Sequence, residues 1–391
     1  MTSVGFIYFL LKLIEIFVLY RVGVSIEKID KNNRIYWKYA SYAIFTFGLV
    51  EGLRWGHMTD YNVYYFNYNS INTFTDVIEY GSLIFAYIAY VFRIFGVGYP
   101  GFLVFQCAFL MFSCFFFLRD YTKHARYVLP CLLMALAMNE NFIRTYLGVS
   151  FLLIGMSYLN RDRYFMTFIY VLLSLLTHFC CGFMVPFLLL KPVLDRGTIK
   201  PLYASIMILY TTSFVSILQM SFFVSFANYI NSLVGGRVDT LALDYLNSMD
   251  RIIEGEGGAA LGVSNADLIS KIKYLLSSIP MLWLCYKKID EIVSGRYLYN
   301  LVIIGLLLYP IFSQVELLGR FTDQLLLFSP IFIGNMVGEC KLCNISRLKN
   351  AIAILSAVIY MYGALNRPFV MPDKEMYFIW DSNGMPVNDR Y

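Results

Sequence analysis

Residues 128–159 read VLPCLLMALAMNENFIRTYLGVSFLLIGMSYL, two apolar runs on either side of a short polar insert at 139–141. Within them, residues 128–137 and 151–159 are continuously apolar, whereas the strands of a membrane barrel alternate apolar and polar residues. Because lipid offers no hydrogen-bond partners, a backbone inside the bilayer satisfies its own polar groups by forming a helix. The stretch therefore predicts two membrane helices joined by a polar turn.

The composition of the whole chain agrees with this local pattern. Of its 391 residues, 59% are hydrophobic and 15% are charged, whereas a soluble domain carries roughly 25% charged residues. A single aqueous core cannot bury so much apolar surface, so lipid must cover the remainder. We therefore expect an all-α fold, a polytopic transmembrane helix bundle that forms one integral membrane domain over residues 1–391.

Segments of nearly membrane-spanning length recur along the chain. A spanning helix needs about 20 apolar residues, and on this basis we predict about 11–13 membrane segments, including short or re-entrant ones. The candidate spans are 4–20, 36–53, 82–98, 101–118, 127–138, 142–159, 164–190, 202–223, 274–286, 298–315, 321–337 and 351–364. Residues 224–273 are predicted to form a longer non-cytoplasmic loop, and residues 365–391 a polar C-terminal tail.

Lys and Arg residues concentrate in short loops, and cytoplasmic loops carry an excess of these residues. The basic loops are 21–37, 119–126, 160–163, 191–200, 287–296 and 339–349. We place all of them in the cytoplasm. The segment 82–118 must then cross the membrane once in net, with the half that contains Arg93 re-entrant or interfacial. The segment 164–190 must leave and return through a bend near His178.

With this topology, the remaining polar residues fall on the non-cytoplasmic side. They come from four separate hairpins and include Arg54, Asp60, Arg144, His178, Glu316 and Arg320. A guanidinium group presents five donors in a planar fork and stays charged when it is partly buried. Two or three such groups suit a phosphate or pyrophosphate whose lipid tail remains in the bilayer. The sequence therefore predicts an anion site at this side.

Structural roles are the alternative for several of these residues. Arg144 could form an ion pair with Glu140, and Arg320 could pair with Glu316 at the helical i,i+4 spacing. His178 could be a satisfied polar residue, although histidine exchanges protons near neutral pH and therefore also suits catalysis. These alternatives stay open at the level of sequence.

Aromatic residues follow the predicted anion-binding loop, and two of them are Tyr61 and Tyr64. Such residues belong to the interfacial belt of membrane proteins, or they stack on sugar rings. Within the first apolar run, Lys12 and Glu15 share one helix face, so we expect a neutralised pair directed into the bundle.

Several classes of function are disfavoured. The chain has no D-x-D motif and no phosphate-binding G-x-x-x-x-G-K-[ST] loop. It has no H-E-x-x-H motif and only one C-x-x-C, so zinc is not supported. We predict no metal and no cofactor. The net charge of +5 is spread over loops, so nucleic acid is not an expected partner.

Three motifs resemble the EpsG family of exopolysaccharide-synthesis proteins, which group with Wzy-type O-antigen and capsule polymerases. The first, similar to R-x-G-x-G-T-D-Y-x-x-Y, is Arg54-Trp-Gly-His-Met-Thr-Asp60-Tyr61-Asn-Val-Tyr64, followed by the acidic turn Glu79-Tyr-Gly81. The second runs from Phe142-Ile-Arg144-Thr-Tyr-Leu-Gly through a basic turn to His178-Phe-Cys-Cys. The third is Gly319-Arg320-Phe321 leading to Pro330. The chain departs from the family pattern at Met58, Thr145 and Cys180-Cys181.

The resemblance implies a membrane glycosyltransferase, a metal-independent polysaccharide polymerase of the cell envelope. Its donor and acceptor would be oligosaccharides on undecaprenyl pyrophosphate, joined at the periplasmic face of the bacterial inner (cytoplasmic) membrane. A chain-length regulator is a further partner that the resemblance suggests. A lipid-linked oligosaccharide flippase or transporter and an O-antigen ligase are the alternatives.

Each site residue receives a predicted role under this hypothesis. Preorganised arginines stabilise the charge that grows on a leaving pyrophosphate, which we assign to Arg144 and Arg320, with Arg54 assisting. A positioned base removes the proton of the acceptor hydroxyl, and His178 and Asp60 are the two candidates. Sugar would be held by Tyr61, Tyr64 and Glu316.

Overall fold

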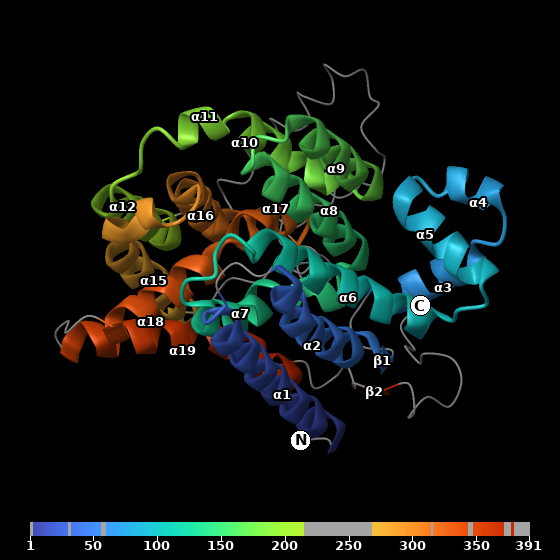
Figure 1. The fold of residues 1–391 in the computed structure, drawn as a ribbon, viewed down its shortest axis with the longest axis horizontal. Coiled ribbons are helices and arrows are strands. Elements are labelled where there is room, and N and C mark those ends of the chain that lie inside the picture. The colour runs from blue at the N-terminus through green and yellow to red at the C-terminus, as the bar shows by residue number, and fades with distance from the viewer. Residues whose placement is uncertain are drawn as a thin grey trace.

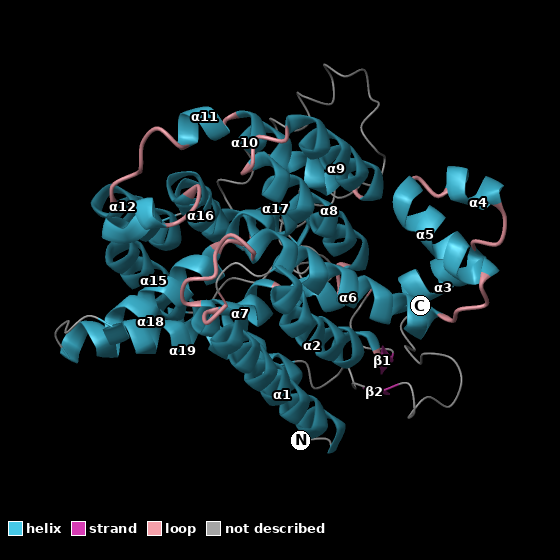
Figure 2. Cartoon of the chain, viewed as in Figure 1, coloured by secondary structure: helices cyan, strands magenta, loops and turns pink. Residues whose placement is uncertain are grey.

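The computed structural model describes residues 3–29, 33–55, 60–214, 268–313, 316–342, 347–370 and 377–378. Over these residues the chain is a bundle of helices (Figures 1 and 2), and the predicted all-α membrane fold is confirmed. The α-helices are α1 (Ser3–Ile26), α2 (Asn33–Gly52), α3 (Tyr61–Ser70), α4 (Phe74–Glu79), α5 (Leu83–Ile94), α6 (Tyr99–Leu118), α7 (Ala125–Ala135), α8 (Ile143–Leu159), α9 (Tyr164–Thr177), α10 (Val185–Leu189), α11 (Lys191–Leu194), α12 (Pro201–Phe214), α15 (Leu268–Cys285), α16 (Gly295–Phe312), α17 (Glu316–Leu326), α18 (Ser329–Leu342) and α19 (Arg347–Val370).

Short 3-10 helices and one pair of strands complete the described elements. The 3-10 helices are η1 (Ala137–Glu140), η2 (Phe179–Met184) and η4 (Tyr286–Glu291). Strand β1 (Arg54–Trp55) pairs antiparallel with β2 (Tyr377–Phe378). The pairing attaches part of the predicted C-terminal tail to the segment that follows α2, and α19 continues to Val370, beyond the predicted start of that tail.

Three of the described helical segments are long and apolar enough, by length and composition, to cross a membrane. They are Tyr99–Leu118, Leu268–Glu291 and Gly295–Phe312. Shorter apolar helices, among them α5, α7, α8 and α9, accompany them. The helix α15 begins at Leu268, inside the predicted loop 224–273, and the rest of that loop up to residue 267 lies outside the described residues.

Helix α5 contains Arg93, the residue that marked the predicted re-entrant half of 82–118. The helix has 12 residues, about 18 Å of length, and is too short for a hydrocarbon core of about 30 Å. Near its end, Arg93 Nη1 donates to Asn69 Oδ1 at 3.0 Å. Its beginning, at Ser82, contacts Arg144 of α8. Figure 1 shows α5 beside α3 and α4 at one edge of the bundle.

The basic loops meet at one end of the bundle, which we call the basic-loop end. The contacts that join them are the ion pairs Glu27–Arg126, Asp120–Arg161, Lys123–Glu291 and Lys123–Glu339 and the hydrogen bonds from Asn300 to the carbonyls of Leu194 and Gly197. Helix α8 ends there at Leu159, and the side-chain amide of the next residue, Asn160, donates to the Tyr121 hydroxyl at 2.9 Å. The same helix begins with Arg144 in its first turn, so Arg144 lies at the opposite end, the arginine end.

Glycines allow close approach of neighbouring helices. On α2, Gly48 and Gly52 face α6, and a Cβ added at Gly52 would collide with the backbone of Val104. On α18, a Cβ at Gly338 would collide with the ring of His124. Because small residues let helix backbones approach each other in membranes, these positions determine how closely α2 packs on α6 and α18 on the start of α7.

The predicted pair of Lys12 and Glu15 is confirmed. The two side chains are buried in α1, with Lys12 Nζ 3.4 Å from Glu15 Oε2. Lys12 also pairs with Glu51, whose carboxylate accepts a hydrogen bond from Tyr8 at 3.2 Å. Helix α2 continues through Gly52, close to the end of the predicted span 36–53, so Glu51 lies in its last turn. One lysine thus bridges two buried carboxylates from α1 and α2.

Candidate functional site

A layer of buried aromatic rings holds the segment after α2 in place. Tyr61 and Tyr64 of α3 are 0% and 2% exposed, and Tyr61 packs edge-on against Tyr99 of α6 at 5.3 Å between ring centroids. Asp60 precedes this helix, and its backbone N–H donates to Asn141 Oδ1 at 3.2 Å. The aromatic packing and this hydrogen bond bring the Asp60 carboxylate to the polar turn before α8.

Arg144 lies on an aromatic support made by the segment between α2 and α5. Its guanidinium carbon is 5.4 Å from the ring centroid of Tyr64 and 5.7 Å from that of Tyr80, which are cation–π distances. Its Nη1 donates to Ser82 Oγ at 3.3 Å. Its Nε is buried and has no hydrogen-bond partner within the described part of the chain. The guanidinium is therefore oriented while part of its donor capacity stays unused.

The phenol of Tyr64 stays protonated in this support. Burial raises the pKa of Tyr64, and the positive charge of Arg144 opposes that shift only in part. A neutral phenol can accept a hydrogen bond from a guanidinium and present its ring face to it, but it does not form an ion pair with Arg144. Arg144 therefore keeps its positive charge available for an anion.

Arg320 reaches the same region from α17. Its guanidinium carbon lies 4.1 Å from the ring centroid of Phe142, and its Nη2 is 3.8 Å from Asp60 Oδ2. The two charged side chains are 14% and 28% exposed. An anion that enters from outside the protein thus meets a guanidinium whose present ion pair is long and partly solvated.

His178 lies at the bend between α9 and η2, where its backbone is extended with φ −157° and ψ 125°. The bend predicted near this residue is confirmed. Its Nδ1 accepts a hydrogen bond from the Cys180 N–H at 3.2 Å. Its side chain is close enough to Arg144 and Arg320 to interact electrostatically with both. Gln324 Nε2 donates to the Cys180 carbonyl at 3.1 Å, which ties α17 to this bend.

Arg54, the third predicted arginine, lies elsewhere. It is 0% exposed, and its Nη1 donates to the Glu51 carbonyl and lies 4.0 Å from the Cys107 sulfur. The Tyr61 hydroxyl donates to the Arg54 carbonyl at 3.3 Å. The described contacts of Arg54 thus belong to the protein interior, and a direct contact with an anion would require rearrangement.

The two tyrosines predicted to bind sugar are buried, whereas residues of an open binding surface would be exposed. Tyr61 and Tyr64 are packed in the aromatic layer, so neither ring face is open to a ligand. Glu316 begins α17, and its side chain lies outside the described residues, as does that of Glu140. The predicted sugar contacts of all three residues stay predictions.

Sequence reasoning missed other residues that shape the site. Tyr80 and Phe142 lie within motifs that the sequence analysis quoted because of other residues. Those motifs were the signal that could have identified them. Ser82 and Gln324 had no sequence signal, because a single hydroxyl or amide within an apolar helical region identifies no partner. The ring supports, Tyr64 with Tyr80 and Phe142, hold the two guanidinium groups that the sequence did single out.

The described helices, three of them long and apolar enough to cross a membrane, form the bundle of a membrane protein. Arg144, Arg320, Asp60 and His178 lie near one another at one end of it. The chain belongs to the EpsG family, whose family model matches residues 35–369. No curated protein and no solved structure matches the chain. The matched range contains all of the predicted site residues, and membership indicates a membrane protein of the polysaccharide-polymerase type.

Proposed function

We propose that this protein is a glycosyltransferase that polymerises oligosaccharide repeat units carried on undecaprenyl pyrophosphate. The observation that carries the proposal is that Arg144 and Arg320, from distant helices, meet near Asp60 and His178 at the end opposite the basic loops. Loops rich in Lys and Arg remain in the cytoplasm, so the arginine end faces the periplasm. Family membership supports the polymerase class.

The reaction breaks the bond between the anomeric carbon of the donor and an oxygen of its pyrophosphate, and negative charge grows on that leaving group. Arg144 and Arg320 are held in advance by ring supports, so they stabilise this charge without reorganising. A preorganised donor of this kind is worth about 3–4 kcal/mol in a water-poor site. The entering pyrophosphate also competes with Asp60 for Arg320, which frees the carboxylate for chemistry.

The new glycosidic bond forms at an acceptor hydroxyl, whose proton must pass to a base. The hydrogen bond at His178 favours Asp60 for this role. Because the Cys180 N–H donates to Nδ1, that nitrogen carries the lone pair and the neutral ring has its proton on Nε2. In this tautomer Nε2 donates and cannot accept. We assign Asp60 as the base and His178 as a hydrogen-bond donor to the donor substrate.

A purified-protein assay with lipid-linked repeat units tests the proposal. Lengthening of the lipid-linked glycan identifies a polymerase, transfer to lipid A identifies a ligase, and transbilayer movement without chemistry identifies a flippase. In cells that lack the protein, we expect a single lipid-linked repeat to accumulate. Arg144→Ala protein that is present at the normal level and still makes full-length polymer would contradict the assigned site.

A further inference from the structure

Three buried side chains form a closed cycle of hydrogen bonds between α6 and η1. The side-chain amide of Gln106 donates to Asn139 Oδ1 at 2.9 Å, and Asn139 Nδ2 donates to the Cys107 sulfur at 3.4 Å. The Cys107 thiol donates to Gln106 Oε1 at 3.4 Å. Each side chain in the cycle therefore donates one hydrogen bond and accepts one, and all three are at most 1% exposed.

The position of Gln106 within α6 indicates that the cycle fixes geometry. Helix α6 is long and apolar enough to cross a membrane, and a buried amide in such a helix costs free energy unless its polar groups are bonded. Apolar side chains of the same shape in place of both amides would avoid that cost. Apolar contacts lack direction, however, whereas a fully bonded polar network makes the local structure rigid and unique.

The cycle holds the turn that leads from η1 into α8. Asn141 lies in the same turn as Asn139, and its side-chain oxygen accepts the Asp60 N–H at 3.2 Å. Arg144 lies in the first turn of the helix that follows. The turn therefore connects the proposed base to one of the two arginines proposed to bind pyrophosphate.

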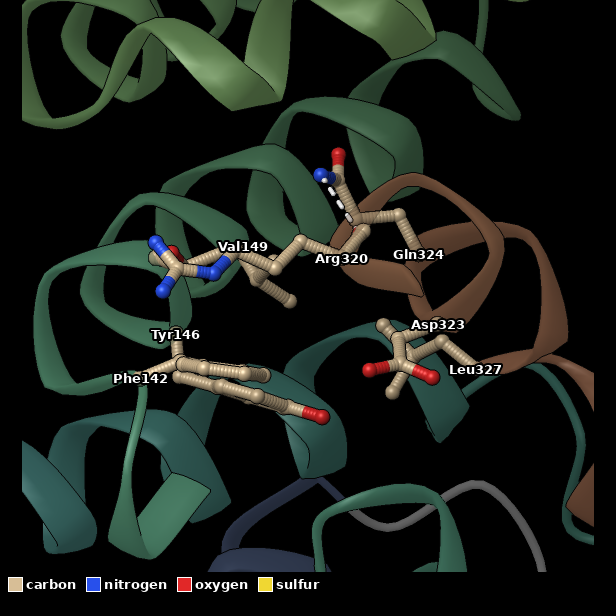
Figure 3. A pocket seen from close by; sticks show the side chains of 8 residues that line it. Phe142, Tyr146, Val149, Arg320, Asp323, Gln324 and Leu327 are labelled. Atoms are coloured by element: carbon tan, nitrogen blue, oxygen red, sulfur yellow. Dashed lines mark hydrogen bonds between the residues drawn. The ribbon is translucent and has the colours of Figure 1, made fainter. Parts of the chain in front are cut away.

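The other arginine reaches the same turn through an aromatic ring. The guanidinium carbon of Arg320 is 4.1 Å from the ring centroid of Phe142, the residue after Asn141. Figure 3 shows Arg320 extended above the rings of Phe142 and Tyr146. A displacement of the turn would therefore move the ring support of Arg320 together with Arg144.

Helix α6 also holds the segment that carries Asp60. Tyr99, in the first turn of α6, packs edge-on against Tyr61, the residue after Asp60. The same helix holds the turn before α8 through Gln106. The position of Asp60 relative to the two arginines therefore depends on one helix that contacts both segments.

We propose that Gln106 is a positioning residue for the transfer reaction, a role that rests on the function proposed above. It acts through Asn139 and sets where Asp60 lies relative to Arg144 and Arg320. Reacting groups that are displaced by about 1 Å lose roughly 10²-fold in rate. Because the base acts only in the chemical step, loss of this alignment should lower kcat more than it changes KM.

Replacement of the amide tests the proposal. Gln106→Met fills a similar volume without an amide, and we expect kcat for glycan lengthening to fall roughly 10- to 100-fold with KM changed less than about twofold. The exchanged pair, Gln106→Asn with Asn139→Gln, restores an amide at both positions and should recover most of the loss. Asn300→Met is the matched control, because it removes a buried amide of α16 that bonds the Leu194 and Gly197 carbonyls at the basic-loop end. The control should lower the Tm and leave kcat unchanged.

Hydrogen exchange measured by mass spectrometry tests the link to Asp60 without requiring activity. Because the Asp60 N–H donates to Asn141, the peptide that contains it should exchange roughly 2- to 10-fold faster in Gln106→Met. Peptides from α16 should keep the wild-type rate.

The two experiments separate the positioning role from the polymerase function. If the wild type does not lengthen glycan and Gln106→Met still exchanges faster at Asp60, the polymerase function fails and the link from Gln106 to Asp60 stands. Unchanged exchange at Asp60 overturns the positioning role. A folded Gln106→Met enzyme with normal kcat also overturns it, as does a loss of kcat that Asn300→Met reproduces at the same Tm.

Discussion

The guanidinium group of Arg320 lies 3.8 Å from the carboxylate of Asp60, although one belongs to α17 and the other to the segment after α2. The distance is long for an ion pair, and the two side chains are 14% and 28% exposed. We expect a dianionic ligand to compete with Asp60 for Arg320. We regard the exchange as the event that recruits Arg320 and releases Asp60.

Replacement of Arg320 tests this exchange. Arg320→Ala should lower the rate of glycan lengthening roughly 10²- to 10³-fold, because one preorganised donor is lost from the leaving-group site. Arg320→Lys should retain part of the rate, since it keeps the charge and loses the planar fork. Arg161→Ala, which removes an ion pair with Asp120 at the basic-loop end, is the control and should polymerise normally. Equal losses in all three variants would disprove a specific role.

Two substitutions at His178 separate its possible roles. His178→Asn retains an acceptor for the Cys180 N–H but loses the distal donor, so we expect turnover to fall while folding is maintained. His178→Gln places an N–H near the former Nε2 and should retain more activity. The acid limb of the pH–rate profile should persist in His178→Gln, because we assign it to Asp60. Loss of that limb would identify His178 as the base.

The ring support of Arg144 makes a separate prediction. Tyr64→Leu should reduce kcat roughly 2- to 30-fold, as expected from the loss of about 0.5–2 kcal/mol of cation–π interaction. Tyr64→Phe keeps the ring and should lose less. Circular dichroism and Tm in detergent would show whether either variant unfolds. A Tyr64→Leu enzyme that is folded and fully active would show that the ring does not position Arg144.

Labelling of introduced cysteines tests the orientation. Thr75→Cys, on exposed α4, should react with a membrane-impermeant maleimide in cells whose inner membrane is intact. Arg163→Cys, in an exposed turn at the basic-loop end, should react only after that membrane is permeabilised. Six of the eight native cysteines, at 107, 114, 131, 180, 181 and 285, are buried, and the unmodified chain is the background control for all eight. The reverse pattern would place the site in the cytoplasm.

Helix packing gives a stability prediction. Gly52→Ala should lower the Tm in detergent, because its methyl group would collide with the Val104 backbone and push α2 away from α6. Gly197→Ala is the control, since a Cβ there meets nothing within 4 Å. Gly-to-Ala replacement is otherwise neutral or stabilising where the backbone permits it. Equal Tm values for the two variants would contradict the close packing of α2 on α6.

The sequence by itself determined the class of fold and much of the arrangement along the chain. Continuous apolar runs require helices because lipid leaves the backbone no other partners, and that rule acts locally. The same local reasoning predicted the pair of Lys12 and Glu15, and the placement of the basic loops predicted the bend at His178. The distribution of basic loops also predicted that Asp60, Arg144 and Arg320 share one end, and the structure brings these residues together there.

Only the tertiary structure decided which side chains touch. The rotation of each helix about its axis depends on packing between segments far apart in sequence, and hydropathy does not encode it. For this reason Arg54, which sequence analysis placed on the same side as the other two arginines, is enclosed in the interior, while Arg144 lies on the rings of Tyr64 and Tyr80. The hydrogen bonds that join Asn139 to Gln106 and Cys107 likewise form only because α6 packs beside the turn before α8, and no local pattern pairs residues 33 and 32 positions apart.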